Sequence, residues 1–119
     1  MPNSVDLDKI SEFVEEWWDK SVMPSLCEFV EIPALSPSFD PDWEANGYLD
    51  AAINTFIAWT RSLPLKGLSL SVHRLKNRSP LLLVKIDGDA DGEVLFYSHL
   101  DNSLHLSKDQ IYQQIKNIL

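Results

Sequence analysis

The hydrophobic pattern of this chain changes its period once, near Pro64, and this change constrains the fold more than any other sequence feature. Before Pro64 the apolar residues recur at the spacing of one face of an α-helix. The first such series is Leu7, Ile10, Val14, Trp17, Val22, Leu26 and Phe29. After Pro64 apolar residues alternate with polar ones, as in a half-buried strand. The sequence therefore predicts helices followed by strands.

Two helices are expected in the N-terminal part. The first begins near Leu7, and Pro24 should kink or restart it, because proline lacks a backbone donor and clashes with the preceding turn. The second covers Trp43 to Ser62, although Asn46-Gly47 weakens its first turns. Residues 32–41 hold three prolines and two serines, which predicts a loop between the helices.

Three strands are expected after the helices. Residues 68–73 alternate in polarity, residues 81–86 form a nearly continuous apolar run suited to an interior strand, and residues 93–98 start a third strand. The predicted fold class is therefore α/β, with two N-terminal helices, three β-strands and a short C-terminal helix. Such a layer is incomplete on its own.

Charge and composition exclude several classes of protein. Residues 1–50 hold twelve acids and two bases, a net charge of −10, whereas residues 51–119 hold six acids and eight bases, a net charge of +2. This balance repels phosphate backbones and argues against nucleic-acid binding. No apolar run approaches the roughly 18 residues of a membrane span, so a cytoplasmic location without membrane contact is expected. The single cysteine, Cys27, is expected to be a buried thiol.

Two segments after the helices carry residues that could bind a metal ion. Asp87, Asp89 and Asp91 alternate around a glycine, which permits a calcium loop, but the closing glutamate is missing and Asp-Gly favours a plain hairpin turn. His99 and Asp101 lie two residues apart on an extended backbone and so face the same side. A carboxylate beside an imidazole can fix the tautomer that binds zinc. By itself the His-x-Asp triplet is weak evidence.

An ordered series of motifs makes the chain resemble the opening of carnosinase-like dipeptidases. These enzymes belong to the co-catalytic zinc peptidases and deacylases, together with aminoacylases and succinyl-diaminopimelate desuccinylases. The resemblance covers roughly residues 7–101. Its elements are Trp17-Trp18, residues 32–43, Gly47, Ala51-Ala52, Trp59, residues 77–80 and residues 94–101, of which His99-Leu100-Asp101 is the sharpest.

The resemblance implies a role for two residues. It assigns His99 as a ligand of one of two zinc ions and Asp101 as the catalytic-site carboxylate that orients the imidazole. In the family the substrates are peptides or acyl-amino acids, and two metal ions activate water and polarise the scissile carbonyl. The family's further ligands lie downstream of this triplet. The chain is thus expected to be an N-terminal fragment of such a zinc-peptidase catalytic domain.

After Asp101 the sequence departs from the family pattern. Residues 1–101 are therefore expected to form the peptidase-like part and residues 102–119 a divergent tail, derived from a truncation, a frameshift or a fusion. Ser107 and Gln110 make a capping box before an apolar repeat, which predicts a short terminal helix. His73 is expected to be a solvated strand residue, and His105 could join His99, Asp101 and Asp109 only in a speculative metal site.

Three functional hypotheses follow from the sequence. The first is a truncated zinc metallopeptidase that is inactive alone, because one histidine cannot hold two zinc ions. The second is a non-catalytic binding or regulatory module that forms homo- or hetero-oligomers with a related subunit through exposed strand edges. The third is a marginally folded product without a function, since a truncated domain loses buried area.

Overall fold

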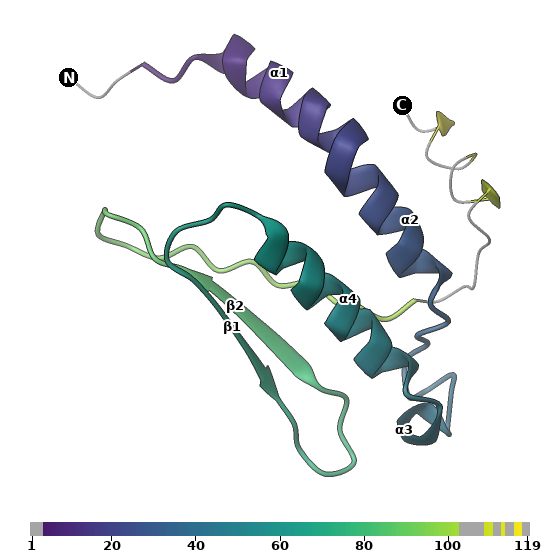
Figure 1. Ribbon diagram of the computed structural model, residues 1–119. Helices are drawn as coiled ribbons and strands as arrows, with labels where there is room; N and C mark the ends of the chain where they lie inside the picture. Colours follow the sequence, from purple (N-terminus) through teal and green to yellow (C-terminus); the bar gives the residue numbers. More distant parts are fainter. Residues whose placement is uncertain (1–3, 103–108, 111–112, 114–115, 118–119) are drawn as a thin grey trace.

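The computed structural model describes residues 4–102, 109–110, 113 and 116–117. A long helical rod, a second helix and a two-stranded hairpin follow one another along the chain (Figure 1). None of the helices within this described part is long and apolar enough to cross a membrane.

The helical rod consists of α1 (Leu7–Trp17), the π-helical η1 (Trp18–Val22) and α2 (Met23–Glu31). Asp6 caps α1, because its side chain accepts a 3.2 Å hydrogen bond from the Lys9 amide. The predicted restart at Pro24 is confirmed, since Pro24 lies in the first turn of α2. A proline ring displaces the carbonyl of the turn before it, and the wider π-helical turn of η1 accommodates that displacement.

The second predicted helix is divided at Gly47 into α3 (Trp43–Asn46) and α4 (Tyr48–Ser62). Gly47 has a φ of 68°, the left-handed conformation that ends many helices and that an L-residue with a Cβ avoids. The prediction of one continuous helix over residues 43–62 was therefore wrong at this residue. The sequence had marked the same position as a weak one.

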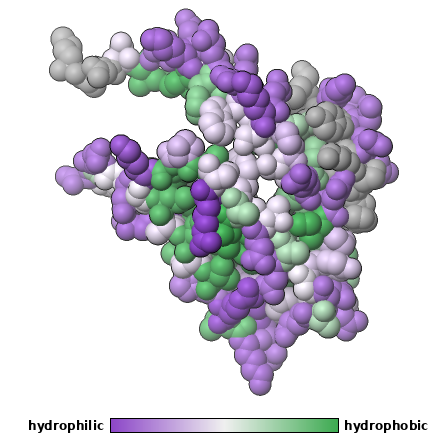
Figure 2. All heavy atoms as spheres, viewed as in Figure 1, coloured by the Kyte–Doolittle hydropathy of each residue, from purple (hydrophilic) through white to green (hydrophobic). Residues whose placement is uncertain are grey.

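The hairpin pairs β1 (Leu68–His73) with β2 (Leu81–Ile86) in antiparallel register, with Leu70 opposite Val84. Both strands were predicted, but β2 is not an interior strand. Its only strand partner among the described residues is β1, and most of its side chains are exposed, Leu81 by 59%. In Figure 2 hydrophobic surface gathers over this hairpin. The apolar run of residues 81–86, which is typical of an interior strand, therefore forms an edge strand.

The prediction of a third strand was wrong, since residues 93–98 pair with no strand in the described part of the chain. Sequence pattern gives a segment its strand tendency, but a strand forms only when another strand pairs with its backbone groups. In the C-terminal tail the described residues 109–110, 113 and 116 are helical. Ser107, Ile111, Ile115 and Leu119 lie outside the described residues, so the short terminal helix stays a prediction.

The core is small and lies between the helices. One buried cluster joins Met23 to Cys27 on α2, and a second joins Ala34 in the following loop to Leu49 and Ala52 on α4. A hydrogen bond of 3.0 Å from Trp59 Nε1 to Ser21 Oγ holds α4 against the rod. By contrast, α1 buries none of its residues.

Substituting Gly47 tests the division of the second helix. We expect Gly47→Ala to lower the free energy of unfolding by about 1 kcal/mol, because a Cβ disfavours the left-handed conformation. No atom lies within 4 Å of the added Cβ, so the penalty is conformational and not steric. The control is Gly47→Asn, since asparagine tolerates this conformation, and chemical unfolding measures both. Equal losses for the two variants would contradict this explanation.

Candidate functional site

The two residues singled out by the sequence, His99 and Asp101, lie on an extended segment that pairs with no strand among residues 4–102. After the acidic turn that follows β2, residues 93–102 run back past α4 toward the loop that follows α2 (Figure 1). Four consecutive apolar side chains in this segment are almost fully exposed. They are Val94 at 82%, Leu95 at 86%, Phe96 at 89% and Tyr97 at 91%.

Asn102 anchors the end of this segment to the helical layer. Its amide donates a 2.7 Å hydrogen bond to the Ala34 carbonyl, and its side-chain Nδ2 donates a 3.1 Å hydrogen bond to the Ile32 carbonyl. Asn102 also forms an isolated parallel bridge with Leu35. These contacts join parts of the chain about 70 positions apart, and they fix where His99 and Asp101 lie.

The side chains of His99 and Asp101 contact each other. His99 Nδ1 lies 2.7 Å from Asp101 Oδ1 and 3.1 Å from the Asp101 carbonyl oxygen. A neutral imidazole in this position donates its Nδ1 proton to the carboxylate and keeps a lone pair on Nε2. The His99 side chain is 78% exposed and that of Asp101 is 29% exposed. The arrangement presents one imidazole nitrogen outward, in the tautomer suited to a metal ion.

A hollow of about 340 Å³ lies beside this pair. Its floor is formed by Leu49 and Ile53 of α4, one wall by residues 79–82 at the start of β2, and the other wall by residues 97–101. We call this hollow the strand slot, because the two walls are an edge strand and an extended segment. His99 and Asp101 stand in its second wall.

The described residues could supply one ligand to a zinc ion, but they do not form a complete zinc centre. Structural and catalytic zinc sites use three or four protein ligands. Within the described part of the chain, no group of three or more histidine, cysteine, aspartate or glutamate side chains is placed to hold a metal ion. His99 with Asp101 behind it would therefore supply one coordinating nitrogen.

The other candidate metal ligands lie apart from this pair. His73 is exposed on β1, where its Nε2 lies 3.0 Å from Ser71 Oγ. Asp87, which follows β2, forms an exposed ion pair of 2.9 Å with Lys85 of that strand. Cys27 is a free, buried thiol in the core, as predicted. His105 lies outside the described residues.

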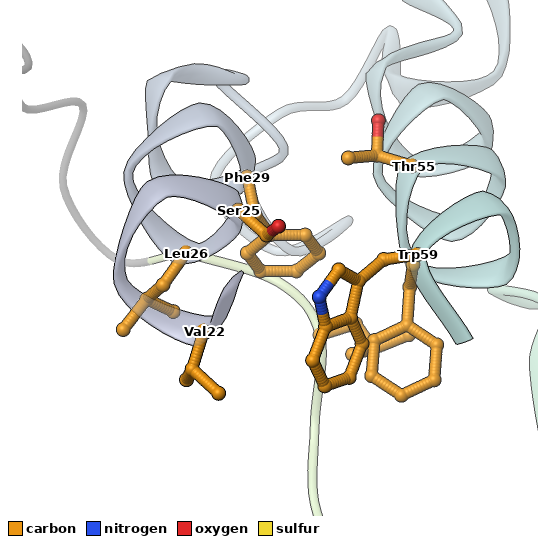
Figure 3. Close-up of a pocket in the computed structure, with 8 residues that line it drawn as sticks. Val22, Ser25, Leu26, Phe29, Thr55 and Trp59 are labelled. Carbon is orange, nitrogen blue, oxygen red and sulfur yellow. The ribbon is translucent and has the colours of Figure 1, made fainter. Parts of the chain in front are cut away.

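A second cavity, of about 210 Å³, opens between α2 and α4 (Figure 3). Its lining is almost wholly apolar and includes Leu26 and Phe29 on one side and Trp59 on the other. None of its lining side chains is ionisable. This cavity could receive an apolar group, but it offers no acid, base or metal ligand for a reaction.

Two carboxylates of the described residues, one at the N-terminus of α1 and one within it, have a lowered pKa and lie outside the site. The Lys9 amide lowers the pKa of Asp6 by donating a hydrogen bond to its carboxylate. A hydrogen bond from the Lys20 ammonium lowers the pKa of Glu16. Both groups are exposed, and both shifts come from local helix contacts, so they mark helix structure and not a functional site.

Comparison with known proteins adds no assignment, because neither a protein-family model nor a curated protein matches this chain.

Asn102 positions the site, and the sequence did not reveal it. The sequence placed a boundary after Asp101 and assigned Asn102 to a divergent tail. An asparagine that donates to two distant carbonyls leaves no periodic pattern, since both of its acceptors are backbone groups. The structure instead includes Asn102 with the segment it anchors.

Replacing Asn102 tests the anchor. We expect Asn102→Ala to lower the free energy of unfolding by about 1 kcal/mol, because a half-buried hydrogen bond to the Ile32 carbonyl is lost, although that carbonyl still accepts a 2.7 Å hydrogen bond from the Ala34 amide. The matched control is Asn54→Ala, since Asn54 is exposed on α4. Urea titration followed by tryptophan fluorescence measures both variants. A loss no larger for Asn102 than for Asn54 would show that the anchor contributes nothing.

Proposed function

We propose that this chain carries the first metal-ligand motif of a dinuclear zinc peptidase of the carnosinase-like type. The observation that supports the proposal is the contact between His99 Nδ1 and Asp101 Oδ1 at 2.7 Å. A carboxylate that holds the ring by one nitrogen aims the other nitrogen at an ion and raises its basicity. The ordered motifs of residues 7–101 support the same proposal. In it, His99 is the zinc ligand and Asp101 its orienting partner.

The chain is not expected to hydrolyse peptides by itself. A two-metal centre needs a bridging ligand and several carboxylates, which hold the ions about 3.5–4 Å apart and activate water between them. A single imidazole supplies neither the second metal position nor a general base. The proposed substrates, peptides or acyl-amino acids, therefore belong to a complete centre to which this motif would contribute one ligand.

A non-catalytic binding or regulatory module is the second candidate function. The observation that favours it is the row of exposed apolar side chains at residues 94–97, which is unusual for a surface segment. We propose a cytoplasmic location for either function, since the free, buried thiol of Cys27 would stay reduced there.

Titration with zinc ions, followed by imidazole resonances in NMR, tests the ligand role. We expect the His99 resonances to shift at lower zinc concentration than those of His73, because, of these two described histidines, His99 is the one whose ring is held by a carboxylate. Asp101→Asn should weaken the response of His99 by about 10-fold to 100-fold, the usual loss when an orienting carboxylate is removed. His73→Ala is the control and should leave that response unchanged. Equal zinc responses at His99 in the native chain and in Asp101→Asn would refute the orienting role.

Hydrolysis of a dipeptide tests the expected lack of activity. With zinc present, the purified chain should release amino acids no faster than the His99→Ala variant does. Quantitative amino-acid analysis of the reaction gives the rate. Zinc-dependent release that His99→Ala abolishes would contradict the inactivity of this chain, although it would support the ligand role of His99.

A further inference from the structure

Both walls of the strand slot could pair with an additional strand. On one wall, β2 pairs with β1 along one edge, and its other edge has no strand partner among the described residues, while Leu81 and Leu82 at its start line the slot. On the other wall, residues 97–101 end beside residues 79–82, where β2 begins. Residues 93–101 therefore run antiparallel to β2, and the slot lies between the start of β2 and the end of this segment (Figure 1). Such a slot offers backbone partners on two sides to one additional strand.

The chain also carries an extended segment that has no strand partner among the described residues. Residues 94–97 are exposed by 82% to 91%, and they form no backbone hydrogen bond with other described residues. Four consecutive apolar and aromatic residues have a high strand propensity, and their exposure to water is unfavourable. Each copy of the chain thus presents both a slot for a strand and an exposed strand.

The charges at the two ends of the hairpin define how a second copy would enter the slot. Lys76 and Arg78 lie in the turn before β2, and neither forms an ion pair with another described residue. Asp89, Asp91 and Glu93 lie in the turn after β2, which leads into residues 94–98. Within one chain the length of β2 separates these two groups, about 20 Å for six residues, and Figure 1 shows the turns at opposite ends.

We propose that two copies of this chain form a closed dimer by exchanging residues 94–98, each copy inserting this segment into the strand slot of the other. The resulting sheet begins with β1 and β2 of the first copy. Residues 94–98 of the second copy follow, and next to them lie residues 94–98 of the first copy. The sheet ends with β2 and β1 of the second copy. A two-fold axis between the two identical central segments makes them antiparallel. The inserted segment then pairs with β2 on one side and with its own counterpart on the other.

This arrangement brings opposite charges together. In the dimer, the inserted segment runs antiparallel to residues 94–98 of the copy that receives it. Those residues run antiparallel to β2 of the same copy, so the inserted segment runs parallel to that β2. The acidic residues at its start, Asp89, Asp91 and Glu93, therefore lie beside the basic turn of the receiving copy, which holds Lys76 and Arg78. The two-fold axis repeats this contact. The large negative charge of the chain resides in residues 1–50, whereas residues 51–119 carry a net charge of +2. The exchanging part is thus free of strong self-repulsion.

Sedimentation equilibrium of the full chain, without metal ions, tests the exchange. We expect a concentration-dependent mass that rises from 13.6 kDa to twice that value and no further, because both slots are filled in the closed dimer. A constant mass of 13.6 kDa would overturn the proposal, as would growth beyond the dimer. The proposal requires no zinc and no peptidase relationship, so its failure would leave the role of His99 untouched.

Blocking the backbone of the exchanged segment provides the first variant. Phe96→Pro removes an amide donor that strand pairing needs, and the proline should raise the dimer dissociation constant at least about tenfold. Because Phe96 is 89% exposed, the monomer loses no packing, and unchanged circular dichroism verifies that it folds. A dimer that forms equally well with Phe96→Pro would overturn the exchange of this segment.

Charge reversal identifies the orientation of the inserted strand. Lys76→Glu combined with Arg78→Glu should weaken the dimer by about tenfold or more, because each reversed turn then faces acids of the second copy. Adding Asp89→Lys and Asp91→Lys to the same chain should restore the dimer. The control carries the same change of charge on other exposed bases, Arg61→Glu with Lys66→Glu, and should dimerise as the native chain does. A reversal that weakens the dimer without rescue would overturn the parallel placement beside β2.

Discussion

The two hydrogen bonds donated by Asn102 are the contacts on which the rest of this structure depends. They join the end of residues 93–102, a segment that pairs with neither β1 nor β2, to the loop that follows α2. Together with the half-buried Leu100, which lines the cavity between α2 and α4, they hold residues 93–101 beside α4, since the side chains of residues 94–97 are almost fully exposed. The place of His99 and Asp101 and the second wall of the strand slot both follow from this anchor.

Backbone pairing explains which elements the sequence could predict. Helices satisfy their own hydrogen bonds, so the apolar series beginning at Leu7 and the proline at position 24 predicted the helical rod and its restart correctly. The hairpin was also predictable, because β1 and β2 are neighbours in sequence and find each other across a short turn. Residues 93–98 have an equally strong strand pattern, yet they form no strand, since strand formation depends on a partner that local sequence does not specify. Gly47 shows the opposite case, in which one residue divided a helix despite a continuous apolar pattern.

The candidate site was predictable only to the extent that it is local. His99 and Asp101 are two residues apart, so the extended backbone brings their side chains together without help from the rest of the fold. The slot beside them needs α4, β2 and the anchor at Asn102, which are distant in sequence, and no local pattern reveals it. The proposed ligand and the proposed exchange therefore share one wall, residues 97–101. The zinc-ligand proposal uses the side chains of these residues, and the exchange proposal uses their backbone groups.

Amide hydrogen exchange of residues 94–98, measured at several protein concentrations, tests most directly whether this segment is an anchored strand without a partner in its own chain. In dilute solution these amides should exchange almost as fast as in an unfolded peptide, whereas the amide of Asn102 should be protected by its bond to Ala34. At higher concentration, residues 94–98 should gain protection together. Strong protection of these residues in dilute solution would show that they already pair within one chain, and rapid exchange at Asn102 would show that the anchor does not form.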